Sequence, residues 1–181
     1  MRTTAATILG GLMQACGMAL LLGLSIGATA QPRPMEEGRH YERIDPPIAT
    51  DTAEDVIEVL DVFWYGCPVC AEFEPMMSYY GGEVRGDVAM RRMPAIWNAV
   101  MRTHAQAYYT AVKLDVAAQA HPLLFQHLQQ EHQPLNTQEQ ARALFGKLGI
   151  SAELFDEAWN SEEVADSLAL AERNTAAAGI T

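Results

Sequence analysis

The sequence predicts an α/β fold in which a strand–helix–strand unit is followed by a series of helices. An apolar, β-branched run from Asp55 to Phe63 is typical of a strand that is buried on both faces. A helical pattern follows it, and alternating apolar residues then indicate a second strand over Val84–Met93. From Trp97 onward the apolar spacing is helical. A strand, helix and strand in this order predict two parallel strands joined by a crossover helix.

Length, composition and charge limit the class of protein. With 181 residues, 49% of them hydrophobic, the chain has the size and composition of one globular domain. Twelve Lys and Arg residues stand against 23 Asp and Glu residues, which gives a net charge of -11. This balance disfavours anionic partners, so we expect no nucleic acid to bind.

The first thirty residues have the pattern of a cleavable secretory signal peptide. Arg2 supplies a basic start, Ala15–Ile26 an apolar core, and Ala28–Ala30 a small-residue cleavage site. The apolar run is too short, and too close to the cleavage site, for a membrane anchor. Cys16 lies inside that run rather than at its end, which disfavours lipid attachment. Export would place the mature chain in an oxidising compartment.

After the signal peptide, 31–37 is predicted to be a flexible lead-in. Arg39–Ile44 is predicted to be an edge strand that Pro46 and Pro47 stop.

A Cys-Pro-Val-Cys segment marks the start of the crossover helix. Gly66 permits a sharp turn, Cys67 falls at the N-cap, and Pro68 falls at the first helical position, where its missing N–H costs nothing. Apolar residues then recur at steps of three and four, which predicts that they form the inward face of the helix. They are Phe73, Met76, Met77 and Tyr80.

The position of the two cysteines predicts different roles for their sulfurs. Cys67 can accept from the free N–H groups of Val69 and Cys70 and lies at the positive end of the helix dipole. Such settings lower a cysteine pKa from about 8.5 to roughly 3.5–7.5, so we expect Cys67 to be the thiolate and its disulfide to be oxidising. Cys70 is then the resolving partner.

Asp61, at the end of the first strand, is a candidate for proton exchange with Cys70. If its side chain points beneath the helix, burial should raise its pKa into a range useful for that exchange. The alternative is a solvated carboxylate at a strand end.

Other roles for a cysteine pair are less well supported. Zinc needs four ligands, and no second pair or His-x-x-x-His follows. Haem attachment needs His where Ala71 stands. A structural disulfide between cysteines three residues apart would close too small a loop to stabilise the fold appreciably. The five histidines show no metal spacing, so each is expected at the surface or in helix packing: His40, His104, His121, His127 and His132. We expect no metal and no cofactor.

The second half of the chain predicts five helices with identifiable ends. Thr137 and Gln140 have the spacing of a capping box, serines precede the last two helices, and Gly179 is a C-terminal stop. The predicted ranges are Ala99–Leu114, Ala117–Gln130 with a break near Pro122, Thr137–Leu148, Ser151–Trp159 and Ser161–Ala178.

The segment Asp61–Pro75, Asp-Val-Phe-Trp-Tyr-Gly-Cys-Pro-Val-Cys-Ala-Glu-Phe-Glu-Pro, resembles the active-site segment of the DsbA-type periplasmic thiol-disulfide oxidoreductases of the thioredoxin superfamily. Further stretches that match are Glu37–Tyr41, Arg92–Asn98 and Ala105–Ala111. The resemblance implies a thioredoxin-like fold with an α-helical insertion. It divides the chain into a signal peptide (1–30), the N-terminal part of the thioredoxin-like domain (31–96) and the helical insertion with its exit helix (97–181).

The resemblance also implies partners and site residues. Cys67 and Cys70 would form the redox-active disulfide that oxidises unfolded, reduced exported proteins in the periplasm, and a membrane quinone-linked oxidase would regenerate it. Pro68 and Val69 belong to the motif. Trp64 and Tyr65 would offer a client an apolar platform, although packing alone also explains them.

The sequence departs from the family pattern in two places. Val69 replaces the usual histidine between the cysteines, which removes one stabilising group and predicts a less oxidising pair. No proline follows Pro134, so the family's cis-proline loop, last strands and final helix are expected to be missing. A truncated, catalytically weak or inactive thioredoxin-like binding module is therefore the alternative to a working enzyme.

Overall fold

The computed structural model describes residues 33–83 and 86–180. The predicted signal peptide lies outside these residues. The chain divides into one unit that ends at Arg43 and a second that begins at Ile44, and each is described by itself.

The described part of the first unit is a turn around Gly38, which has a φ of +80°. A single bridge joins Glu37 and Tyr41, and Arg43 pairs with Glu37 at 3.2 Å. The edge strand predicted over Arg39–Ile44 is wrong. The Gly38 N–H donates to the Tyr41 carbonyl and the His40 N–H to that of Glu36, so local turn bonds occupy groups that a strand would use.

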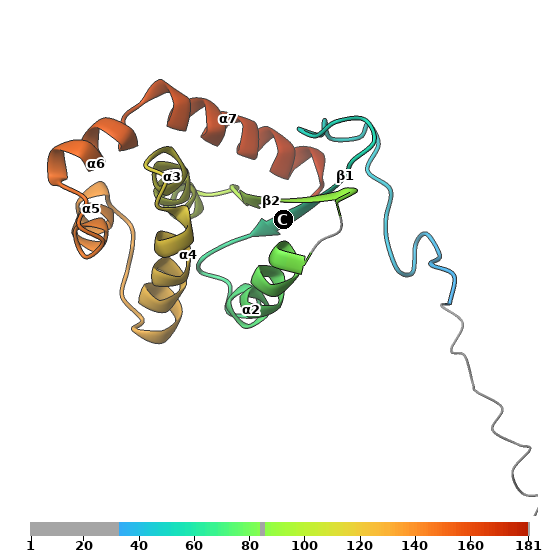
Figure 1. Ribbon diagram of the computed structural model, residues 1–181, viewed down its shortest axis with the longest axis horizontal. Helices are drawn as coiled ribbons and strands as arrows, with labels where there is room; N and C mark the ends of the chain where they lie inside the picture. The colour runs from blue at the N-terminus through green and yellow to red at the C-terminus, as the bar shows by residue number, and fades with distance from the viewer. Residues whose placement is uncertain (1–32, 84–85, 181) are drawn as a thin grey trace, which may run out of the picture. The chain divides into compact units, whose positions relative to one another are not determined.

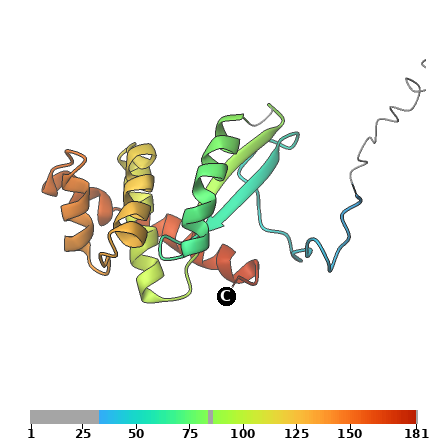
Figure 2. The ribbon, with the colours of Figure 1, turned by 90° about the horizontal axis from the view of Figure 1, so that it is seen from below.

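The second unit contains the predicted parallel pair of strands. Strand β1 is Ile57–Phe63 and β2 is Val88–Pro94, and helix α2, Pro68–Glu83, connects them (Figures 1 and 2). The register sets Asp61 opposite Arg92 and Val62 opposite Met93. The predicted crossover is therefore confirmed.

Alternation along β1 sends its side chains to opposite faces of the sheet. Leu60 and Val62 pack with Met93 of β2 against helix α7, Glu162–Ala177. Phe63 belongs to the other core cluster, on the side of α2. Helices α2 and α7 accordingly lie on opposite sides of the sheet (Figure 1). This alternation is what directs Asp61 toward α2 rather than α7.

The predicted helices are confirmed with small shifts at their ends. They are α3 Ala99–Lys113, α4 Ala117–Phe125, α5 Gln138–Gly146, α6 Ala152–Trp159 and α7. The capping box of Thr137 and the serine caps form, and Gly179 ends α7 with a φ of +65°. The break predicted near Pro122 is wrong, because α4 continues through it and the irregularity is a π-helix, η1, at Gln126–Gln130.

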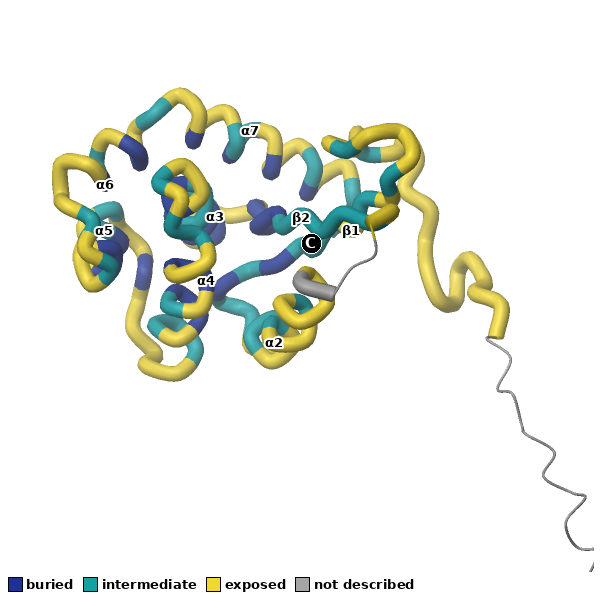
Figure 3. Tube along the Cα trace, in the orientation of Figure 1, coloured by how far each residue is buried: buried dark blue, intermediate teal, exposed yellow. Residues whose placement is uncertain are grey.

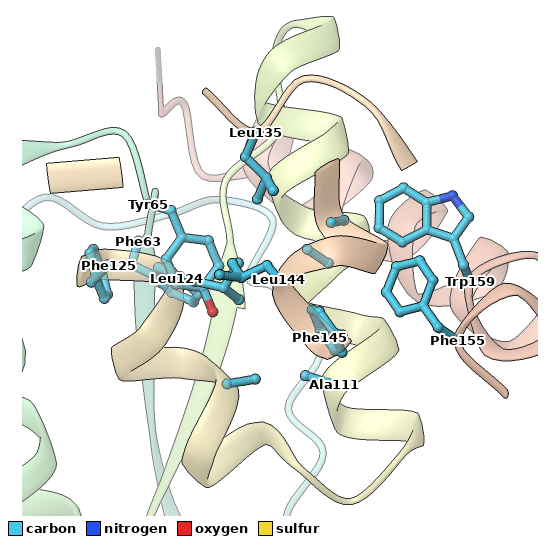
Figure 4. Close-up of a cluster of buried hydrophobic side chains, with 13 residues drawn as sticks. Phe63, Tyr65, Ala111, Leu124, Phe125, Leu135, Leu144, Phe145, Phe155 and Trp159 are labelled. Atoms are coloured by element: carbon cyan, nitrogen blue, oxygen red, sulfur yellow. The ribbon is translucent and has the colours of Figure 1, made fainter. Parts of the chain in front are cut away.

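The main core joins the end of β1 to the helices that follow the sheet. Phe63 and fully buried Tyr65 pack with residues of α3 to α6 in one cluster (Figure 4). Figure 3 shows buried stretches along these helices. Its far end includes Phe145 and Phe155, whose ring centroids lie 4.9 Å apart. Cys70 packs against this cluster, so the helices support the cysteine pair directly.

The inward face of α2 differs from the predicted one. Of the four predicted residues Met77 is half-buried, whereas Phe73, Met76 and Tyr80 are exposed by 43 to 54%. The side chain of Glu74 is instead 15% exposed and bound to Arg92 of β2. The prediction failed because apolar spacing alone marked the face, whereas Cys70 and an ion pair orient the helix. Among the described residues, no helix has the length and apolar character needed to cross a membrane.

Candidate active site

The cysteine pair lies where β1 passes into α2. The turn after Phe63 is closed by a hydrogen bond from the Cys67 N–H to the Trp64 carbonyl, 3.0 Å long. Pro68 begins the helix, as predicted, and the Cys70 N–H donates to the Cys67 Sγ at 3.2 Å. Both cysteines are free thiols and half-buried. The helix start therefore offers the Cys67 sulfur a donor that stabilises negative charge on it.

Cys70, in contrast to Cys67, is held as a protonated thiol. Burial, the hydrogen bond with Cys67 and the nearby charges of Cys67 and Asp61 raise the pKa of Cys70 to about 11, against the lowering effect of the Trp64 backbone. A thiol with this pKa keeps its proton near neutral pH. The two sulfurs are thus inequivalent, with Cys67 at the helix start and Cys70 protonated behind it.

Asp61 lies on the α2 side of the sheet. Burial raises the pKa of this carboxyl and so does the charge of Glu74, whereas Arg92, whose Nε is 3.6 Å from Oδ2, and His121 lower it. The net shift is upward. A carboxyl with a raised pKa that acts electrostatically on Cys70 is placed to exchange a proton with it. This role remains a prediction.

Three further charged or polar residues join Asp61 to the helices. Arg92 binds Glu74 at 2.6 Å, and Glu74 binds the Nε2 of His121 at 3.0 Å. Burial acts to raise the Glu74 pKa, but bonds from His121 and Ser78 and the charges of His121 and Arg92 lower it overall. Glu74 is therefore an anion at neutral pH, and it holds the side chains of Arg92 and His121 in place.

A cavity of about 560 Å³ opens beside this network, between α2 and α4. Glu74, Arg92 and His121 line it together with Tyr108 and apolar residues of both helices. Of the two carboxylates in the network, Glu74 lines the cavity and would contact water there.

Two residues of the turn bind histidines of the helices. The Trp64 Nε1 donates to the Nδ1 of His104 at 3.0 Å, and the Tyr65 hydroxyl lies 2.7 Å from the Nδ1 of His121. Tyr65 is 0% exposed, so its side chain cannot contact a client. The predicted client contact is therefore wrong for Tyr65, and the alternative, packing in the core, applies. Of the other motif residues, Pro68 and Val69 are exposed, Val69 by 71%, and Trp64 is half-buried.

His104 predicts a pH dependence of stability. Burial lowers the pKa of His104 to about 4, although the backbone of Leu135 opposes the shift. The unfolded chain binds a proton at this histidine near pH 6.5, whereas the folded chain binds it only near pH 4. Acidification through this window therefore lowers the free energy of unfolding by about 3 kcal/mol. Urea unfolding from pH 7 to 4 measures the loss.

His104→Gln should flatten this pH dependence, because the variant has nothing to titrate at that position. His132→Gln, at an exposed site, should keep it. Equal pH profiles for the wild type and His104→Gln would contradict the assignment.

The sequence analysis missed Glu74, Arg92 and His121 as parts of the site. One signal was present, since Glu74 follows Cys70 by four residues and therefore shares its helix face. For Arg92 the signal was its place in a predicted strand beside that of Asp61. His121 lies 47 residues from Glu74, and no local pattern connects them.

Comparisons with known proteins agree with this geometry. A family model described as a DSBA-like thioredoxin domain matches residues 83–181. The thiol:disulfide interchange protein DsbA of Azotobacter vinelandii is 29% identical over 162 residues, which cover 86% of this chain and 75% of that protein. The protein of the same name from Bordetella pertussis is 31% identical over 148 residues, 80% of this chain and 70% of its own.

The fold also matches solved structures. The crystal structure of Pseudomonas aeruginosa DsbA superposes with a TM-score of 0.71 at 28% identity, covering 76% of this chain and 71% of that one. A cysteine pair at the first turn of a helix that follows a parallel strand defines the class, a thioredoxin-like fold with added helices. Within that class, the chain belongs to the DsbA-like thioredoxin domain family.

Proposed function

We propose that the protein is a thiol-disulfide oxidoreductase that donates or exchanges disulfides in exported proteins through Cys67-Pro68-Val69-Cys70. The observation that carries the proposal is the inequivalence of the two sulfurs. Cys67 Sγ accepts a hydrogen bond from the helix start, while the pKa of Cys70 is raised to about 11. One sulfur is thereby suited to attack and leave as a thiolate, and the other to be a protonated resolving thiol.

The exchange proceeds from the disulfide form in two steps. A client thiolate attacks Cys67, the bond between Cys67 and Cys70 breaks, and Cys70 leaves as a thiolate that takes a proton. A second client thiolate then attacks the client sulfur of this mixed disulfide, and Cys67 leaves as a thiolate stabilised by the Cys70 N–H. The client loses two electrons and gains a disulfide, and the protein gains two electrons as a dithiol.

Asp61 supplies the proton that Cys70 takes. Its pKa is raised, so a protonated fraction exists closer to neutral pH than for an exposed aspartate. The Asp61 side chain is 15% exposed, so solvent can return the proton to it after each turnover.

Val69 sets the strength of the oxidant. This residue stands between the cysteines with its side chain 71% exposed, and an apolar side chain donates no hydrogen bond to the Cys67 thiolate. We therefore propose a pair less oxidising than one that has histidine at this position.

The proposed partners and location follow from the family. We propose that clients are unfolded or reduced exported proteins, which contact Trp64, Pro68 and Val69, and that a membrane quinone-linked oxidase restores the disulfide. The signal-like pattern of residues 1–30 and the family together support a periplasmic location.

The redox equilibrium of the pair with glutathione tests the proposal. The chain from Gln31 onward is equilibrated with mixtures of reduced and oxidised glutathione, and the free thiols are alkylated and counted by mass spectrometry. We expect readily reduced Cys67 and Cys70 in a chain whose circular dichroism shows a folded protein. A folded chain whose two thiols react like free cysteine would overturn the proposal.

A redox-inactive thioredoxin-like binding module is the second candidate. The observation in its favour is the sheet, which has two strands within residues 33–83 and 86–180, with Ile57 and Val59 of β1 exposed. An exposed strand edge of this kind can pair with a strand of another chain. The glutathione experiment separates the candidates, because a binding module needs no reactive Cys67.

A further inference from the structure

The helices that follow the sheet bind the turn before Cys67 at three points. Two are the bonds already described, from Trp64 to His104 of α3 and from Tyr65 to His121 of α4. The third involves main chain rather than a side chain: the Gln129 Nε2 donates to the Tyr65 carbonyl oxygen at 2.8 Å. Gln129 is thus the side chain from the helices that fixes the backbone of this turn, two residues before the reactive sulfur.

Gln129 belongs to an unusual helical turn. Residues Gln126–Gln130 form a π-helix in which the Glu131 N–H donates to the Gln126 carbonyl at 3.0 Å, five residues back. Such turns are rare, and they are found frequently at functional sites. The π-helix continues directly from α4, whose Leu124 and Phe125 are buried in the core. Gln129 therefore projects from a firmly anchored element.

The turn that Gln129 holds has little freedom of its own. Tyr65 is 0% exposed, and a Cβ at Gly66 would collide with the ring of Trp64. The Cys67 N–H is bonded to the Trp64 carbonyl at 3.0 Å. In so tight a turn, a displaced Tyr65 carbonyl would displace Cys67 relative to the start of α2.

We propose that Gln129 is a positioning residue for exchange at Cys67. This inference rests on the function proposed above and deepens it. By holding the Tyr65 carbonyl, the Gln129 amide keeps the Cys67 sulfur within reach of the Cys70 N–H, 3.2 Å away. The helices thereby determine how strongly the Cys67 thiolate is stabilised, although Gln129 itself touches no reacting atom.

Alkylation of Cys67 as a function of pH tests the inference. The rate reports the thiolate fraction and requires neither client nor redox partner, so this measurement can fail independently of the proposed function. Without the Gln129 donor the Cys67 thiolate should lose stabilisation. We expect Gln129→Ala to shift the pH profile upward and lower the rate at neutral pH by about five- to tenfold. The equilibrium constant for reduction by glutathione should fall by a similar factor.

Two further variants make the result decisive. Gln130→Ala truncates the exposed neighbour in the same π-helix and should leave the pH profile unchanged. Gln129→Met keeps most of the side-chain volume but removes the donor without adding a charge, so it should reproduce the shift even where Gln129→Ala folds poorly. A wild-type pH profile in folded Gln129→Met, or a loss of thermal stability in both Gln129 variants without any shift, would overturn the inference.

Discussion

Replacing Cys67 with serine is expected to abolish oxidation of a reduced client peptide, with a fall of at least about a thousandfold to the uncatalysed rate. The reason is that Cys67 is the sulfur at the helix start, which accepts from the Cys70 N–H. A serine hydroxyl can keep that hydrogen bond, but it forms no disulfide. Fluorescence or mass-spectrometric detection of disulfide formation in a two-cysteine peptide measures the rate.

Cys70→Ser is the matched control, because it removes the resolving sulfur and keeps Cys67. When it is first linked to a small disulfide at Cys67, it should exchange with a client peptide that has a single thiol and accumulate the mixed disulfide, because neither Cys70 nor a second client thiol is there to resolve it. Burial is the largest cause of the raised pKa of Cys70 and persists in the Cys67→Ser variant, so Cys70 should stay protonated there and attack a disulfide slowly. Equal reactivity of the two single-cysteine variants would contradict the assigned roles.

The sequence predicted the cysteine site better than its surroundings because the site is local. The strand, the turn at Gly66, the N-cap position of Cys67 and Pro68 at the first helical position all lie within a dozen residues, so turn and capping preferences suffice to place them. The capping box at Thr137 was predictable for the same reason. Each depends on spacing that the chain itself fixes.

What the sequence could not predict depends on contacts between distant elements. Glu74 is turned inward because Arg92 and His121 bind it, and these come from β2 and α4. Apolar periodicity placed Phe73, Met76 and Tyr80 inward instead, because it scores hydrophobicity and takes no account of a charged partner. The bond from Gln129 to Tyr65 spans 64 residues and lies in a π-helix, which no pattern of apolar residues indicates.

Arg92→Met is expected to lower the free energy of unfolding at pH 7 by about 3 kcal/mol. Arg92 lies between Asp61 and Glu74, whose side chains are each 15% exposed, and its removal leaves two mostly buried carboxylates without their cation. Methionine retains much of the apolar stem, so the loss reports mainly the charge.

Urea unfolding followed by circular dichroism measures the change, with Arg102→Met as the control. Arg102 pairs with Glu172 at 2.8 Å, but both side chains are over 40% exposed, so its loss should cost less than 1 kcal/mol.

The loss in the free energy of unfolding caused by Arg92→Met should become smaller in acid, because proton binding is linked to folding. Without the guanidinium, the folded-state pKa of Asp61 rises further and that of Glu74 is no longer held down by Arg92. The folded variant then binds protons at these carboxylates at a higher pH than the folded wild type, so its stability relative to the wild type recovers as the pH falls toward 4. Adding Asp61→Asn should restore part of the loss at pH 7, because one of the two uncompensated charges is gone. A deficit that is independent of pH, and unchanged by Asp61→Asn, would mean that Arg92 stabilises the fold by packing rather than by joining the two carboxylates.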